Sequence, residues 1–148
     1  MKARNLVSER RTVRTDDPAS EAARLLAQQD VRAILVVDPS GAFAGVISDS
    51  DLLRRLLPPY LEDNEALARV LEESASEALS RRLEGRTVAD LMPPDRDEVP
   101  VVLADDTLVE VAAVMVRARA SLVGVLDGGH LIGGISIDAL LARLMGGP

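Results

Sequence analysis

The sequence contains one arrangement of residues twice, and this repeat constrains the fold more than any other feature. Each copy has an acidic pair, a stretch with helical spacing, an apolar run, a turn, a second apolar run and a Gly-x-x-Ser step. The copies span residues 13–57 and 101–145, and before the turn they correspond at the constant offset between Asp17 and Asp106. After the turn the offset is one residue shorter, which matches Ser48 with Ser136. Each unit is too small for a large core of its own, so we expect the two units to share one.

Local patterns predict the order strand, helix, strand, strand, helix in the first copy. Asp17 suits the N-cap of the first helix, and Pro18 suits its first helical position. Asp38-Pro39-Ser40-Gly41 is typical of a hairpin turn, and Pro58-Pro59 must end the last helix. The predicted helices cover 18–28 and 51–57, and the predicted hairpin strands cover 33–37 and 43–47.

The second copy and the segment between the copies complete the prediction. The second copy predicts strands over 99–103, 121–126 and 131–136 and helices over 107–118 and 138–145. Residues 60–86 lie outside the repeat and have apolar residues spaced for one face of a helix, so we interpret them as an inserted amphipathic connector. This connector is either a lid on its own module or a surface that binds a protein partner. The predicted division is therefore 1–59 for the first repeat, 60–86 for the connector and 87–148 for the second repeat.

Composition excludes several classes of partner. Aromatic residues make up only 1% of the chain, so the stacking platforms of single-strand nucleic-acid binders are absent. A net charge of −7 repels phosphate backbones, and nucleic acid is not an expected partner. No stretch approaches the ~18 apolar residues of a membrane-spanning helix. We therefore expect a soluble, cytoplasmic protein that does not bind membranes.

The sequence shows no catalytic or metal-binding set. The absence of cysteine removes disulfides, thiolate zinc sites and a cysteine nucleophile. The only histidine, His130, follows Gly128-Gly129 in a predicted turn, where an exposed loop residue is favoured over a base or a ligand. No pair of carboxylates stands in settings that would separate their pKa values. We expect neither an enzyme nor a metal protein.

Three segments give the chain a resemblance to a known family. They are the run Thr87-Val88-Ala89-Asp90-Leu91-Met92, the apolar strand that ends at Asp38, and Gly45-Val46-Ile47-Ser48-Asp49-Ser50-Asp51-Leu52. Because the order of these pieces occurs twice, the chain resembles a tandem pair of CBS (cystathionine β-synthase) domains, or Bateman module. The resemblance implies an α+β fold of two βαββα repeats with pseudo-twofold symmetry, packed through their sheets, with two clefts between them. It also implies adenosine-containing ligands and pairing into homodimers.

The segment around Ser48 suits a nucleotide. A strand that leads directly into a helix is expected to present unpaired backbone N–H groups and the positive end of the helix dipole, which favour phosphate. The Ser48 hydroxyl can donate to a phosphate, and the Asp51 carboxylate can accept from ribose hydroxyls. The alternative is a capping box that satisfies only the helix end. Asp49 is interpreted as a solvated first-turn acid, while Arg54 and Arg55 are either surface charges or phosphate partners.

The family analogy places adenine between aliphatic walls near Thr12 and Val13 and near residues 32–34. The second copy departs from the pattern, because Ala139 stands where the first copy has Asp51 and the nearby acid, Asp138, is one place early. One place turns a side chain by about 100° around a helix, so Asp138 is expected to cap the helix without reaching a ribose. We thus expect one competent and one degenerate site. The predicted ligand-binding residues are Thr12, Val13, Arg32, Ala33, Ile34, Val46, Ile47, Ser48, Asp51, Ser136 and Asp138.

Two functions remain open. The first is a regulatory sensor that binds AMP, ADP, ATP or S-adenosylmethionine and acts on a separate partner. The second is a structural or interaction module with vestigial clefts, in which the connector binds another protein. In both cases we expect a homodimer.

Overall fold

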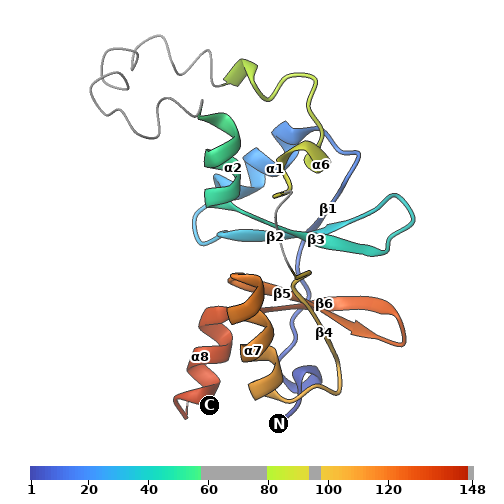
Figure 1. The fold of residues 1–148 in the computed structure, drawn as a ribbon, viewed down its shortest axis with the longest axis vertical. Coiled ribbons are helices and arrows are strands. Elements are labelled where there is room, and N and C mark those ends of the chain that lie inside the picture. The colour runs from blue at the N-terminus through green and yellow to red at the C-terminus, as the bar shows by residue number, and fades with distance from the viewer. Residues whose placement is uncertain (58–79, 94–97, 147–148) are drawn as a thin grey trace.

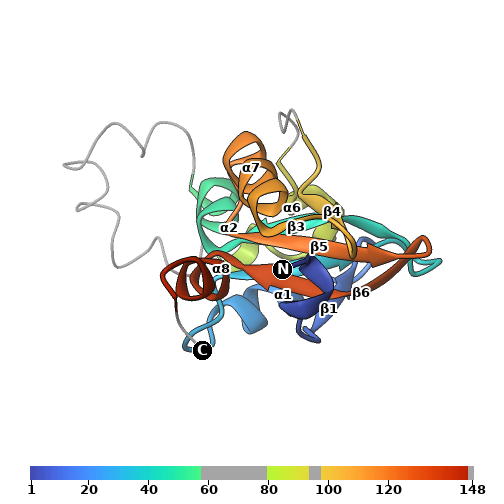
Figure 2. The ribbon, with the colours of Figure 1, turned by 90° about the horizontal axis from the view of Figure 1, so that it is seen from below.

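The computed structural model describes residues 1–57, 80–93 and 98–146 and has two lobes whose sheets face each other. Helices cover the outer face of each sheet, and the strands of both sheets run in roughly the same direction (Figures 1 and 2). The first lobe contains β1 (Thr12–Arg14), α1 (Ala19–Leu26), β2 (Ala33–Val37), β3 (Phe43–Ser48) and α2 (Asp49–Leu56). The second lobe contains β4 (Val101–Leu103), α7 (Leu108–Ala118), β5 (Leu122–Asp127), β6 (His130–Ser136) and α8 (Ile137–Leu144).

The two sheets have the same topology. In each, the first strand pairs in parallel with the second, and the second pairs antiparallel with the third. Each hairpin has a register shift at an equivalent place, between Val36 and Val37 in the first lobe and between Val125 and Leu126 in the second. The α+β class and the two βαββα repeats are therefore confirmed.

Each lobe has its own apolar core, so the prediction of one shared core holds only for a smaller cluster of buried residues between the sheets. Leu35 and Val46 from the first sheet cluster with Leu122 from the second, and all three are buried. Phe43 lies against Gly124, where an added Cβ would stand 2.7 Å from the Phe43 Cε1 atom. Gly124 leaves room for the one phenylalanine of the chain, so this contact fixes how the sheets meet.

Short segments cross between the lobes. The 3-10 helix η1 (Ala3–Asn5) packs on the second lobe, where the backbone N of Ala3 donates to the O of Asp106 at 2.8 Å and Ala3 joins the apolar core. Helix α6 (Val88–Leu91) packs on the first lobe, where the backbone N of Val88 donates to the O of Asp17 at 2.9 Å. The sequence predicted Thr87–Met92 as the start of the second repeat, and its packing on the first lobe was not foreseen.

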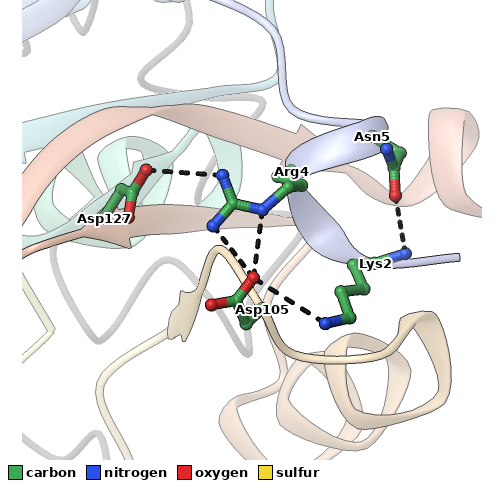
Figure 3. Close-up of polar contacts among 5 residues, drawn as sticks. All are labelled: Lys2, Arg4, Asn5, Asp105 and Asp127. Atoms are coloured by element: carbon green, nitrogen blue, oxygen red, sulfur yellow. Dashed lines mark hydrogen bonds and ion pairs between the residues drawn. The ribbon is translucent and has the colours of Figure 1, made fainter.

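An ion-pair cluster also holds the N-terminal segment on the second lobe. Figure 3 shows the Arg4 guanidinium between two carboxylates from different places in the chain. Its Nε and Nη2 atoms donate to Oδ1 of Asp105 at 3.0 and 2.9 Å, and its Nη1 atom lies 3.5 Å from Oδ2 of Asp127. Lys2 Nζ lies 3.9 Å from the same Asp105 oxygen. At the equivalent place on α6 stands Ala89, so the first lobe has no counterpart to Arg4.

Two repeated glycines mark the places where the crossing segments pass. Gly45 and Gly133 have φ values of +153° and +151°, which residues with side chains rarely adopt. A Cβ on Gly45 would stand 2.6 Å from the Met92 Cε atom, and one on Gly133 would overlap the backbone oxygen of Ser8. The crossing therefore explains why this glycine occurs in both copies.

The helix boundaries differ from the predictions in two respects. Asp17 is not the N-cap of α1, because its carboxylate accepts from the backbone N of Arg14 at 2.8 Å and Pro18 occupies the cap position. Asp138 is not the N-cap of α8, because Ser136 caps that helix through the backbone N of Ala139 at 3.4 Å. Pro18, one residue after Asp17, and Ser136, two residues before Asp138, therefore take the cap positions that we assigned to aspartates.

Most of the predicted connector lies outside the described residues. Of its described part, Leu83 packs against the core of the first lobe. The predicted division at residues 59 and 86 and the role of the connector stay predictions. Among the described ranges, no helix has the length and apolar character needed to cross a bilayer.

Candidate functional site

Two clefts lie between the lobes and combine residues of both. The first, here called the Ser48 cleft, has a volume of ≈ 750 Å³ and includes the start of α2 and the junction between α7 and β5. The second, here called the Ser136 cleft, has a volume of ≈ 690 Å³ and includes the start of α8 and the junction between α1 and β2. Each cleft thus pairs the Ser-containing motif of one lobe with the helix–strand junction of the other.

Ser48 and Asp51 form a reciprocal capping box at the start of α2. The Ser48 Oγ atom accepts from the backbone N of Asp51 at 3.1 Å, and the Asp51 Oδ2 atom accepts from the backbone N of Ser48 at 2.9 Å. Asp51 is only 7% exposed, and its Oδ1 atom lies 3.8 Å from Nη1 of Arg54. The capping box that the sequence predicted is therefore present. Both residues also line the Ser48 cleft, so capping and a place in the cleft coexist.

The expectation of unpaired N–H groups at the start of α2 was wrong. The backbone N of Asp49 donates to the O of Arg32 at 2.8 Å, and the backbone N of Ser50 donates to Oδ1 of Asp49 at 2.7 Å. The backbone N of Asp51 is bound by Ser48, as described above. Because all three amides have partners within the protein, attraction for an anion must come mainly from side chains.

Arginines supply that attraction in the Ser48 cleft. The cleft is lined by Arg32, Arg54, Arg55 and Arg119, against the two acids Asp49 and Asp51. The Arg55 Nη2 atom donates to the backbone O of Met92 at 3.2 Å. Within the described part of the chain, the guanidinium groups of Arg32 and Arg119 have no hydrogen bond or ion pair. A net positive cleft in a chain of charge −7 is a local feature that favours an anionic ligand.

The Ser136 cleft has a different charge balance. Its arginines, Arg10, Arg11 and Arg32, face an equal number of acids, Glu9, Asp30 and Asp138. Asp138 is exposed, and a hydrogen bond from the Ser136 hydroxyl, helped by the charge of Arg10, lowers the pKa of its carboxyl. Since Ala139 replaces the acid of the capping box, no carboxylate reaches back to Ser136 from that position. The two clefts thus differ in both charge and helix capping.

The structure separates the predicted ligand-binding residues. Arg32 lines both clefts, Val46 lines the Ser48 cleft, and Ala33 and Ile34 line the Ser136 cleft. Thr12 lines a third cavity of ≈ 460 Å³. Val13 and Ile47 are buried in the core of the first lobe and line none of these three cavities.

The expected adenine walls beside Ser48 therefore need correction. Side chains alternate along a strand, so Val13 and Ile47 point to the helices that cover the sheet. Ala33 and Ile34 line the cleft of the opposite motif because each motif faces the other lobe's junction. The Ser48 cleft is walled instead by residues that were not among the predicted ligand-binding residues, namely Leu91, Pro93, Ala118, Arg119, Ala120 and Ser121.

A signal for Arg119 exists in the repeat itself. Arg119 corresponds to Asp30 at the offset of the repeat, and both residues have a positive φ, 52° and 69°. Arg119 is the C-cap of α7, whereas Asp30 lies in the turn between α1 and β2, and each lines one cleft. The repeat could have indicated an exposed bend at residues 30 and 119. It could not have indicated which of the two Ser-containing motifs each bend faces.

Comparison with known proteins identifies the family. The family model for the CBS domain matches residues 3–58 and 88–146. The chain therefore belongs to the CBS domain family and contains a tandem pair of these domains. No curated protein matches the chain in sequence.

Solved structures show the same fold. A CBS domain-containing protein of unknown function from Kribbella flavida is 37% identical, with a TM-score of 0.83 over 98% of this chain and 99% of that one. The CBS domain of a CBS domain-containing membrane protein from Sphaerobacter thermophilus is 26% identical, with a TM-score of 0.69 over 95% and 86% of the two chains. CBSX2 of Arabidopsis thaliana, in complex with AMP, is 21% identical, with a TM-score of 0.66 over 98% and 96%.

Proposed function

We propose that this chain is a regulatory module that binds an adenine nucleotide, or another adenosyl ligand such as S-adenosylmethionine, in the Ser48 cleft. The observation that carries the proposal is the charge of this cleft, where four arginines face two aspartates. The volume of ≈ 750 Å³ lies within the usual range for small-molecule sites. The complex of CBSX2 with AMP supports the choice of ligand class, since that protein has the same fold.

The residues of the cleft have distinct roles in this proposal. Arg32 and Arg119 bind phosphate through paired N–H groups, because a guanidinium matches phosphate geometry. The Ser48 hydroxyl donates to a phosphate oxygen while its oxygen still accepts from Asp51. The Asp51 carboxylate accepts from a ribose hydroxyl, and Val46 and Leu91 form apolar walls for the adenine.

The module acts on a partner rather than on a substrate. In the described ranges, no group of three or more His, Asp or Glu side chains is placed to bind a metal ion. We propose that nucleotide binding changes how the lobes present their surfaces to a separate protein. The connector is one candidate surface for that protein.

We also propose that two copies of the chain pair through the outer faces of α7 and α8. Val109 and Val116 on α7 are 73% and 77% exposed, and Leu141 on α8 is 53% exposed. The spacing of Val109 and Val116 places them on one face of α7. Light scattering should give the mass of a dimer, and V116E should give that of a monomer. A wild-type monomer at high concentration would contradict this pairing.

A thermal-shift panel with AMP, ADP, ATP and S-adenosylmethionine tests the nucleotide proposal. A ligand at a hundred times its dissociation constant should stabilise the folded chain by about 2.7 kcal/mol. We expect at least one member of the panel to raise the Tm, and the shift to fall strongly in R119E. Isothermal titration of the same variants gives the dissociation constants.

The matched control is R24Q, because Arg24 is exposed on α1, pairs with Glu21 and lines none of the three cavities. Its ligand-induced shift should equal that of the wild type. A panel without any shift would favour the alternative function, a protein-interaction module with vestigial clefts. An unchanged shift in R119E would remove the Ser48 cleft as the site.

A further inference from the structure

Arg32 lies where the two clefts meet. It is one of three residues that line both clefts, together with Ser121 and Ile137. Its backbone is fixed, because its carbonyl oxygen accepts from the backbone N of Asp49 at 2.8 Å. Its side chain is exposed and, among the described residues, has no hydrogen bond or ion pair. One free guanidinium is thus available to both clefts.

The pseudo-symmetry of the fold does not supply a second such cation. Ser121 occupies the equivalent position in the second lobe, where its carbonyl oxygen accepts from the backbone N of Ile137 at 2.8 Å. The backbone contact is therefore duplicated, whereas the charge is not. Because Ser121 carries no charge, it cannot supply a second cation to either cleft.

Loss of Arg32 has unequal consequences for the two clefts. Without it, the Ser48 cleft still has three arginines against two acids. The Ser136 cleft would keep only Arg10 and Arg11 against Glu9, Asp30 and Asp138. Its charge balance would then be negative, which opposes an anionic ligand. The Ser136 cleft depends on Arg32 more strongly than the Ser48 cleft does.

We propose that Arg32 couples the two clefts negatively. A phosphate-bearing ligand in the Ser48 cleft recruits the Arg32 guanidinium and thereby lowers the affinity of the Ser136 cleft for a second anionic ligand. The coupling is reciprocal, because the two binding free energies share one interaction term. This inference rests on the proposed function, since it requires nucleotide binding in the Ser48 cleft. With this coupling, the first bound ligand lowers the affinity of the module for the second.

Calorimetric titration of the full chain with AMP tests the coupling. In R119E, which disables the Ser48 cleft, Arg32 is left to the Ser136 cleft. In wild type, AMP reaches the Ser136 cleft when the Ser48 cleft is already filled. We expect the Ser136 cleft of R119E to bind AMP about tenfold more tightly than this, which is within the usual range of coupling between sites. When R32Q is added to wild type and to R119E, the Ser136 cleft should bind AMP with the same affinity in both proteins. Adding R10E to R119E should abolish the remaining binding, which assigns it to the Ser136 cleft.

The outcomes separate this inference from the proposed function. A wild type that binds neither AMP nor any other member of the thermal-shift panel overturns both. If wild type binds one equivalent of AMP and R119E binds none, only the coupling is overturned. The coupling is also overturned if wild type binds the second AMP as tightly as the first or more tightly. The coupling is supported if wild type and R119E each bind one equivalent of AMP and the binding to R119E is lost when R10E is added. R54E provides a second way to disable the Ser48 cleft, because it reverses one of the positive charges that line it. Arg54 is 73% exposed, so its replacement should leave the fold intact.

Discussion

The Ser48 cleft and the Ser136 cleft are built from equivalent segments but differ in charge and in helix capping. The Ser48 cleft has a reciprocal capping box and an excess of arginine, whereas the Ser136 cleft has a one-sided cap and balanced charges. Position 119 is an arginine where position 30 is an aspartate, so the same bend in the backbone carries opposite charges. The repeat therefore gives two clefts with the same framework, while differences at a few positions give them different charges and caps.

The largest expected effect concerns the crossing segments, which pass close to Gly45 and Gly133. G133A should destabilise the chain by about 3 kcal/mol or more, since a strained φ alone costs about 1–3 kcal/mol and the Cβ would meet the backbone of Ser8. G45A should cost less, because its Cβ meets the end of the flexible Met92 side chain. Chemical denaturation measures both. Equal losses, or a smaller loss for G133A, would contradict the account of the crossing.

Exchanging the charges at positions 119 and 30 tests the comparison of the clefts directly. R119E should weaken AMP binding in the Ser48 cleft by about 10- to 100-fold, the range expected for losing a charge-assisted hydrogen bond. D30R should instead strengthen binding in the Ser136 cleft, because it gives that cleft the charge that Arg119 gives the other. Calorimetry of both variants, with R24Q as control, reads these affinities. If D30R weakens binding or R119E leaves it unchanged, charge is not what distinguishes the clefts.

A smaller effect is expected from the two serine caps. S48A should destabilise α2 by about 1 kcal/mol, the usual value for an N-cap. S136A should cost less, because the Ser136 Oγ atom accepts from Ala139 at a longer 3.4 Å and lacks a reciprocal carboxylate. Urea denaturation of both variants in ligand-free buffer gives the difference, and S20A on the exposed side of α1 serves as the control. A larger loss for S136A would show that the capping box adds nothing.

The smallest effect is expected from the ion pairs that hold the N-terminal segment on the second lobe. R4A should lower the Tm slightly, and high salt should reduce the difference from wild type, because these charges are exposed. The hydrogen bond from Arg4 lowers the pKa of the Asp105 carboxyl. The stabilisation is therefore complete above the unfolded-state pKa, about 3.9, and is lost as the pH falls through the lower folded-state pKa. Thermal scans of R4A and wild type from neutral to acidic pH follow this loss, and a Tm difference that grew on acidification would contradict it.

The sequence predicted the elements of each repeat because their patterns are local. The hairpin strands and the helix over 107–118 agree with the structure to within a few residues. The positions of η1 and α6 could not be predicted in the same way. Val88 and Leu91 indicate one buried face on a short helix, but their spacing does not say which of two similar cores that face joins. The crossing depends on contacts between residues that are distant in sequence.

The candidate site was predictable only in part for the same reason. Ser48, Asp51 and Val46 belong to one continuous motif and line one cleft, as expected. Arg119 comes from the other repeat, and no local pattern connects it with Ser48. The backbone N–H groups of α2 were expected to be free, but the oxygen of Arg32 and the side chains of Ser48 and Asp49 bind them. Those partners follow from strand register and side-chain orientation, which the sequence does not specify.

A crystal structure of the full chain with AMP is the most direct test of the proposed site. The account predicts AMP in the Ser48 cleft, with its phosphate bound by Arg32 and Arg119 and its ribose hydroxyls within hydrogen-bond distance of the Asp51 carboxylate. AMP bound only in the Ser136 cleft or on the outer surface, or its absence from crystals grown at saturating concentration, would contradict it.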